Sequence, residues 1–259
     1  MSSSGRRAGA GTGREARDRR EGESLARLAR EVVACAACPR LRRYCEEVAA
    51  RRKPEFAGWT YWGRPVPGFG DPRARVLVVG LAPAAHGANR TGRMFTGDSS
   101  GHWLVRALYR AGFSTQPTSV HRRDGLRLRE AYVTAVVRCA PPQNRPTPAE
   151  IARCLPFLER ELALLPHVEV IVALGRVAFD ACRALLRRRG ARVQGLRFAH
   201  GAAYRLGPGL PVLVASYHPS RQNTNTGKLT EAMLDRVFQR VRDVLERGRP
   251  AARAREKTR

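Results

Sequence analysis

The sequence predicts one α/β domain whose parallel sheet of four strands is covered by helices on both faces. Its 259 residues, 43% of them apolar, are enough to bury the core of one such domain and short for two. Four short apolar runs recur along the chain, and helical patterns lie between and around them. This alternation of strands and helices is typical of a parallel sheet with helices on both sides.

The four predicted strands are rich in β-branched residues, as expected of strands that are buried on both faces. They are Arg75 to Leu81, Ala131 to Val137, Val168 to Leu174, and Pro211 to Ser216. Helical patterns occur at about 100–111, 148–163, 176–189 and 228–248, and two more lie near 24–34 and 39–52. Residues 1–22 and 249–259 hold little to bury, so we expect disordered tails around a domain at 23–248.

The charge of the chain points to an anionic partner. A formal charge of +26 attracts polyanions, among which nucleic acid is the commonest partner of a soluble protein. Only three of the 48 basic residues are lysine, and such an arginine-rich composition also arises from codon bias, so charge alone does not decide. The chain has neither an apolar run near the ~18 residues of a membrane helix nor an apolar secretory signal, so we expect a cytoplasmic protein.

Ligands of open α/β sheets bind beyond the carboxyl ends of the strands. Three of the four predicted strands lead into unusual loops there: the first spans Gly80 to Asp98, the second Cys139 to Pro146 and the fourth His218 to Gly227. The third strand passes through Gly175 almost directly into a helix, which looks structural. The glycines of the first loop fit neither phosphate-loop nor dinucleotide-binding spacing, so nucleotide hydrolysis and dinucleotide binding lose support.

Paired cysteines suggest a metal or cluster site. Cys35 and Cys38 form a C-x-x-C pair between two helices, and fourteen residues separate Cys139 from Cys154. In a reducing compartment such pairs favour ligands over disulfides, although ordinary burial of free cysteines is the alternative. The spacing does not separate zinc from iron–sulfur. The two other cysteines, Cys45 and Cys182, are assigned to the core.

Asp98 stands at the end of the first loop and the start of a helix. Its carboxylate can cap the helix by accepting backbone N–H bonds. Its place beyond the first strand would also let the carboxylate face a developing positive charge. The two roles are compatible, and the residues alone favour them about equally.

Three further side chains in these loops are candidates for a site. His218 follows a strand and precedes Pro219, which favours a functional histidine over a structural one. Phe95 is either a core anchor or a stacking platform for a planar base. Asn144 either makes a turn or pairs with a base edge through its amide.

Four basic residues flank the loops, and they would grip phosphates unless they merely reflect the basic composition. They are Arg90, Arg93, Arg221 and Lys228.

These segments together resemble the uracil-DNA glycosylase superfamily, and within it family 5 (type b). The resemblance covers about residues 24–248. Its most specific part is Gly-Leu-Ala-Pro-Ala-Ala-His-Gly-Ala-Asn-Arg-Thr-Gly-Arg-Met-Phe-Thr-Gly-Asp at 80–98, followed by His-Pro-Ser at 218–220. The resemblance implies a three-layer α/β/α sandwich with a four-stranded parallel sheet. It also implies a 4Fe-4S cluster held by Cys35, Cys38, Cys139 and Cys154.

By resemblance, the protein would flip uracil out of double-stranded DNA and hydrolyse its N-glycosidic bond, leaving an abasic site. Hypoxanthine and other deaminated bases would also be substrates, and the enzyme would act as a monomer. Phe95 would stack on the base, and Asn144 and His218 would contact it. The implied catalytic residues are Asp98, His218 and Asn144, and the implied substrate-binding residues are Gly80, Ala82, Pro83, Ala84, His86, Phe95, Ser220 and Arg221.

The first motif departs from the wider superfamily in its water-directing group. Other members carry an acid or an amide at positions that here read Pro83, Ala84 and Ala85. This departure is a mark of family 5, and Asp98 becomes the candidate that directs water. The motif contains no lysine, so a Schiff-base lyase step is not expected.

Two rival interpretations remain open at this point. The first is a non-enzymatic DNA-binding protein with a zinc site of four cysteines, which would be colourless where an iron–sulfur protein is brown. The second is a family 4 glycosylase restricted to uracil, and the alanine-rich first motif argues against it.

Overall fold

A computed structural model describes residues 24–247, so both predicted tails, 1–22 and 249–259, lie outside the described residues. Four parallel strands form the centre of the sheet in the order β3-β2-β4-β6. They are β2 (Val76–Gly80), β3 (Ala131–Ala135), β4 (Val170–Leu174) and β6 (Val212–Ser216), and each lies within its predicted range. The four-stranded parallel core is confirmed.

The sheet as a whole is wider than predicted. Two antiparallel strands of two residues each extend it to six strands: β1 (Phe69–Gly70) pairs with β3, and β5 (Ala203–Tyr204) pairs with β6. Such short edge strands carry no apolar run, so hydrophobic periodicity does not detect them. The sheet is therefore mixed, with its parallel part in the middle.

Six long helices match the six predicted ones within a few residues. They are α2 (Leu25–Ala34), α3 (Pro39–Arg51), α5 (Ser99–Arg110), α6 (Pro148–Leu164), α7 (Arg176–Arg188) and α9 (Glu231–Arg247). The last helix begins three residues later than expected, because the Thr230 hydroxyl accepts the Met233 N–H at 3.2 Å in the manner of an N-cap. Shorter segments were not predicted: α4 (Ala88–Thr91), α8 (Arg221–Asn225) and the 3₁₀ turns η1 (Pro54–Phe56) and η2 (Pro142–Asn144).

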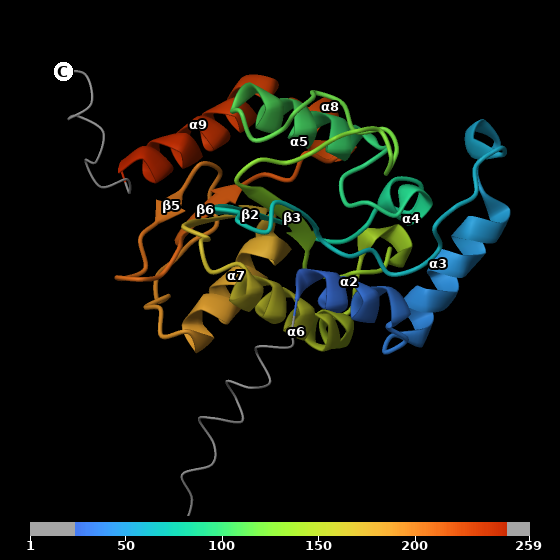
Figure 1. Ribbon diagram of the computed structural model, residues 1–259, viewed down its shortest axis with the longest axis horizontal. Coiled ribbons are helices and arrows are strands. Elements are labelled where there is room, and N and C mark those ends of the chain that lie inside the picture. Colours follow the sequence, from blue (N-terminus) through green and yellow to red (C-terminus); the bar gives the residue numbers. More distant parts are fainter. Residues whose placement is uncertain (1–23, 248–259) are drawn as a thin grey trace, which may run out of the picture.

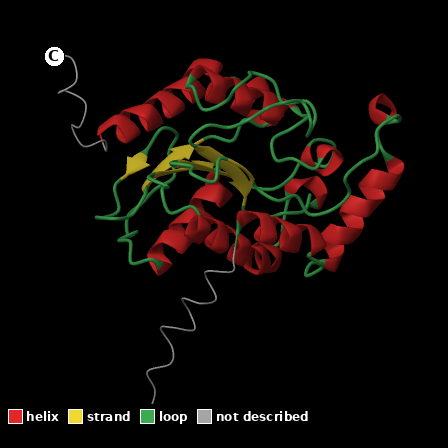
Figure 2. Ribbon diagram, viewed as in Figure 1, coloured by secondary structure: helices red, strands yellow, loops and turns green. Residues whose placement is uncertain are grey.

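Helices cover both faces of the sheet, as the three-layer architecture requires (Figures 1 and 2). On one side α5 and α9 pack on Val76 and Val78 of β2. On the other, α6 and α7 pack on Leu77 and Val79 of the same strand. Alternate residues of one strand thus enter two separate cores. Within residues 24–247, none of the helices has the length and apolar character needed to span a bilayer.

A buried ion pair fastens the end of β3 to α6. Arg138 Nη2 lies 2.6 Å from the Glu161 carboxylate, and both side chains are almost completely buried, with 1% and 2% exposure. Thr134 of β3 donates to the same carboxylate at 2.7 Å and also contacts Arg138. Since an unpaired charge at this depth would be strongly destabilising, the triad fixes where the loop after β3 begins.

Candidate active site and cysteine-lined cavity

Phe95 and His218 face each other beyond the carboxyl ends of β2 and β6. Their ring centroids lie 5.9 Å apart, and the ring planes are inclined by 33°. Phe95 is 8% exposed and His218 is half-buried. Burial lowers the pKa of His218 to about 4, so the imidazole is neutral at pH 7. A neutral imidazole beside an aromatic ring can hydrogen-bond a planar base that lies on the ring.

Glycine at position 80 lets Phe95 lie close to the end of β2. A Cβ atom there would approach Phe95 Cζ to 2.6 Å. Phe95 itself has φ 49°, in the left-handed region that a bulky residue rarely adopts. A backbone conformation of this kind costs energy and persists only where the surrounding structure enforces it. Such residues are common at functional sites.

Asp98 is the N-cap of α5, which confirms its structural role. Its Oδ1 accepts the Gly101 N–H at 2.8 Å. The other oxygen is closely approached by the first loop, because a Cβ atom on Gly87 would lie 1.9 Å from Oδ2. Burial raises the pKa of Asp98, and the Gly101 N–H and the positive charges of His102 and Arg221 oppose this rise. Asp98 is therefore a partly buried acid beside Gly87 of the first loop.

The loop after β6 orients His218 through a residue that the sequence did not single out. Ser220 caps α8 by accepting the Asn223 N–H at 3.4 Å. The Asn223 side chain then donates to the carbonyl of His218 at 2.8 Å. Arg221, the first residue of α8, is exposed. An amide that reaches back to a strand-end carbonyl is a common turn device, but sequence gives no sign of which asparagine makes it.

Several other residues of the first loop make contacts within the protein. His86 Nδ1 lies 3.0 Å from the Tyr61 hydroxyl, and burial lowers the pKa of His86. Ala82 packs against the core on the α6 and α7 side, and Pro83 is buried. The Ala84 carbonyl accepts the Asn89 N–H at 3.0 Å and so folds the loop back on itself. These residues shape the loop, and their contact with a substrate stays a prediction.

Asn144 lies in η2, just beyond the end of β3. Its side chain is exposed, its φ is 56°, and its backbone N–H donates to the Pro141 carbonyl at 3.1 Å. The turn-forming role is thus present. Within residues 24–247 its side chain has no hydrogen-bond partner, and contact with a base stays a prediction.

The four predicted cysteine ligands line one narrow cavity. Cys35 and Cys38 come from the turn between α2 and α3, Cys139 follows β3, and Cys154 lies in α6. The Arg138 backbone N–H donates to Cys154 Sγ at 3.3 Å. Among the side chains of residues 24–247, no three from His, Cys, Asp or Glu are arranged to hold a single metal ion. The pairs that are distant in sequence nevertheless meet around one space.

The two remaining cysteines are buried, as predicted. Cys182 of α7 is 1% exposed, and burial raises the pKa of its thiol to about 12. Cys45 is completely buried and lies beside Cys139. A hydrogen bond with Cys45 and burial raise the pKa of Cys139, whereas the positive charge of Arg42 lowers it. Cys45 is therefore a core residue that also borders the cysteine cavity.

Comparison with known proteins identifies the family. The model of the uracil DNA glycosylase superfamily matches residues 67–242. A "Type-5 uracil-DNA glycosylase" of Thermus thermophilus is 55% identical over 207 residues, covering 80% of this chain and 92% of the relative. The chain belongs to the uracil-DNA glycosylase superfamily. A second Type-5 member, from Pyrobaculum aerophilum, is 50% identical over 211 residues (81% of this chain and 88% of the relative).

Similarity within the superfamily favours Type 5 over Type 4. A "Type-4 uracil-DNA glycosylase" of Pyrobaculum aerophilum is 34% identical over 158 residues, which cover 60% of this chain and 71% of the relative. Both Type-5 relatives match at higher identity and over more of the chain. The alanine-rich first motif had indicated the same branch, and this assignment to the family is confirmed.

Two arginines of this superfamily member do not play the role that the sequence suggested. Arg90 was expected to grip phosphates, but it is 3% exposed and lies over the rings of Phe56 and Trp59, 3.8 and 4.1 Å from their centroids. It also donates to the carbonyls of His86 at 2.8 Å and Gly97 at 2.7 Å. Arg90 therefore joins His86 to Gly97 within the first loop, and the expectation for it is wrong.

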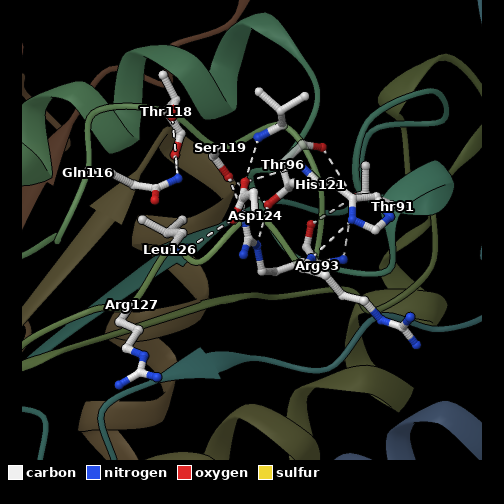
Figure 3. A network of polar contacts seen from close by, with 12 residues as sticks. Thr91, Arg93, Thr96, Gln116, Thr118, Ser119, His121, Asp124, Leu126 and Arg127 are labelled. Atoms are coloured by element: carbon white, nitrogen blue, oxygen red, sulfur yellow. Dashed lines mark hydrogen bonds and ion pairs between the residues drawn. The ribbon is translucent and has the colours of Figure 1, made fainter.

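Arg93 is likewise internal, and Figure 3 shows the network of polar contacts around it. It is 7% exposed, pairs with Asp124 at 2.8 Å, and donates to the hydroxyls of Thr96 at 2.9 Å and Ser119 at 3.1 Å. A long loop needs partners for its buried polar groups, and this network supplies them. Of the four basic residues, Arg221 and Lys228 are exposed, and Lys228 Nζ lies 5.1 Å from the Tyr217 ring centroid.

Proposed function

We propose that this protein is a DNA repair glycosylase that excises uracil from double-stranded DNA by hydrolysing the N-glycosidic bond. Membership of the superfamily and the names of its Type-5 relatives support the activity. The observation that carries the proposal is the Phe95–His218 pair, whose ring centroids lie 5.9 Å apart. One side chain offers a flat apolar face and the other a hydrogen-bond donor, which are the two contacts that an everted pyrimidine needs.

The base must leave the duplex before it reaches this pair. Extruding a nucleotide requires a few kcal/mol of unstacking and unpairing, and less for a weak pair such as G·U. The segment 220–226, which includes α8, begins two residues after His218 and presents exposed polar side chains. We assign to it the insertion into the duplex at the position that the base leaves.

Cleavage of the N-glycosidic bond then places positive charge on the sugar and negative charge on the base, and different groups of the site stabilise the two charges. The sugar gains oxocarbenium character while the departing uracil carries the electron pair of the broken bond. His218, neutral at pH 7, donates an N–H to the uracil anion. The Asp98 carboxylate and the DNA phosphates face the sugar cation. Because both groups are already oriented, little reorganisation is needed as charge develops.

Water completes the reaction. Its oxygen bonds to the sugar carbon, one of its protons passes to the Asp98 carboxylate and then to solvent, and an abasic site remains. Residues 80–98 and 139–146 contain no lysine to form a Schiff base, so the protein stops at base removal and is monofunctional.

We further infer that Cys35, Cys38, Cys139 and Cys154 hold a 4Fe-4S cluster. Such a cluster bonds one thiolate to each iron, so its ligands surround a space, and the cavity lined by these four cysteines is of that kind. Bound there, the cluster supplies a crosslink between the α2–α3 turn, the end of β3 and α6. Anaerobically purified protein should be brown and contain iron and acid-labile sulfide. Colourless protein with zinc would favour the zinc-site alternative.

The base range extends beyond uracil in this proposal, with hypoxanthine as the first candidate. Ala84 contributes no polar side-chain group that would reject a larger base, which supports such tolerance. The substrate is duplex DNA, and the enzyme works as a monomer in the cytoplasm. Incubating duplexes that carry uracil, hypoxanthine, xanthine or ethenocytosine, followed by alkaline cleavage at abasic sites, tests the activity and its range together. No strand break at uracil would refute the function, and breaks at uracil alone would refute only the wider range.

A further inference from the structure

Arg42 lies beside the cysteine cavity, and one nitrogen of its guanidinium has no hydrogen-bond acceptor. It lies on α3, four residues after the N-cap Cys38, and its backbone N–H donates to the Cys38 carbonyl at 3.0 Å. Arg42 lines the cavity together with the four cysteines. Nη2 pairs with Glu46 at 2.9 Å, whereas Nη1 is buried and has no hydrogen-bond partner.

Buried donors without an acceptor are costly and therefore rare. In residues 24–247 five buried side-chain nitrogen or oxygen atoms lack a partner, and two of them belong to arginines that line this cavity, Arg42 Nη1 and Arg138 Nε. Unpartnered donors on two arginines that line the same cavity as four cysteines point to an acceptor in that cavity. Sulfur atoms of a cluster and its thiolates are such acceptors.

The charges of the two arginines are balanced differently. Arg138 is neutralised by Glu161, which is 2% exposed and 2.6 Å away. The partner of Arg42, Glu46, has a side chain that is 60% exposed, so solvent screens its charge. The guanidinium of Arg42, 22% exposed, thus contributes a positive charge to the cavity that nothing inside it cancels.

We propose that Arg42 is the counter-charge of the cluster and donates Nη1–H to one of its sulfurs or to a ligating thiolate. The proposal rests on the 4Fe-4S cluster inferred above. Four thiolates around a [4Fe-4S]²⁺ core carry a net charge of −2, and at this depth such a charge needs a cation or several N–H donors. Arg42 is a positioning residue, since it acts through the cluster and does not touch DNA in this role.

Arg42 also separates the cluster site from the solvent. The same side chain lines a larger open groove of about 970 Å³ between α2, α3 and residues 61–67. It therefore forms a partition between that groove and the cysteine cavity. Losing the side chain would open the cluster toward water as well as remove its positive charge.

The electrostatic consequence is measurable. Adding an electron makes the cluster more negative, so a nearby cation and N–H donor stabilise the reduced state more and raise the reduction potential. Arg42→Met removes the charge and the donor at similar length. Arg42→Lys keeps the charge, and Arg43→Met is the matched control because Arg43 is exposed on the same helix and does not line the cavity.

The test is voltammetry of the full-length, cluster-loaded protein, scanned through reduction of the cluster to the +1 state and oxidation to the +3 state. At the wild-type midpoint we expect Arg42→Met to lower the ratio of reduced to oxidised cluster about tenfold, or 59 mV for one electron. Arg42→Lys should recover most of this shift, and Arg43→Met should show none. Equal midpoints for Arg42→Met and Arg43→Met would overturn the proposal.

Iron and sulfide contents of the same samples separate the possible failures. Wild-type protein without iron would refute the cluster itself, whatever the variants do. A cluster that is lost in Arg42→Met and retained in Arg42→Lys supports the need for a cation. Equal loss of the cluster in Arg42→Met and Arg42→Lys would contradict a role of charge at this position.

Discussion

Phe95 and His218 meet across a strand that belongs to neither of their loops. Phe95 follows β2 and His218 follows β6, and β4 lies between these strands in the sheet. The meeting is possible because β4 has no loop of its own: it turns at Gly175, with φ 92°, directly into α7. A Cβ atom at Gly175 would already lie 3.4 Å from His218 Cβ. Because no loop follows β4, space remains beyond its end in which the two rings face each other.

Two substitutions of Asp98 separate its charge from its capping role. Asparagine is as good an N-cap as aspartate, so Asp98→Asn should keep the helix, whereas Asp98→Ala should lower the free energy of unfolding by about 1 kcal/mol. Both should reduce single-turnover excision of uracil at least about a hundredfold while DNA binding persists. Full activity in Asp98→Asn would remove the carboxylate from the mechanism.

The close approach of Gly87 to Asp98 gives an independent test of the same carboxylate. In Gly87→Ala the new methyl group would lie 1.9 Å from Oδ2, so Asp98 must move. We expect excision to fall by one to two orders of magnitude, on the order of the positional sensitivity of oriented catalytic groups. Gly58→Ala is the control, since its Cβ would meet nothing within 4 Å. Similar rates in the two variants would show that the position of Asp98 is unimportant.

His218 makes stability depend on pH in a predictable direction. Its pKa falls from 6.5 to about 4 on folding, so below pH 6.5 the unfolded chain binds a proton that the folded protein rejects. Stability from this group is fully present above pH 6.5 and declines toward pH 4, by at most about 3 kcal/mol. His218→Gln should lack this decline, so its melting temperature should fall less than that of the wild type over this interval. Parallel pH profiles would contradict a buried neutral imidazole.

The segment 220–226 should matter for duplex DNA in particular. Single strands need no unpairing, so a shortened segment should reduce excision from double-stranded substrate more than from single-stranded substrate. Single-turnover rates on the two substrates provide the measurement. An equal loss of rate on both substrates would instead indicate that α8 acts by positioning His218. The Asn223 side chain donates a hydrogen bond to the His218 carbonyl at 2.8 Å.

Much of this architecture follows from local sequence pattern. Buried parallel strands are β-branched runs such as Val76–Gly80, and their carboxyl ends share one edge of the sheet, where a ligand was expected to bind. The proximity of Phe95 and His218 agrees with that expectation. The two edge strands were not predicted because a strand of two residues is too short to show an alternation of apolar and polar side chains.

The partners of polar groups were the hardest to predict. Whether an arginine faces DNA or the interior depends on a residue far along the chain, as with Arg93 and Asp124. The same holds for Arg42, whose place at the cysteine cavity depends on how α3 packs beside the end of β3 and α6. Spacing in the sequence contains no information of this kind, and the three-dimensional structure supplies it.

The pocket between Phe95 and His218 is tested by the release of free uracil from a G·U duplex, measured for the wild type, Phe95→Ala and His218→Ala under single-turnover conditions. We expect the wild type to release uracil. Each variant should bind the duplex but release uracil more slowly by about one order of magnitude or more for the lost stacking platform, and by at least about two for the lost donor. Release at the wild-type rate by both variants would contradict a pocket built on these two rings.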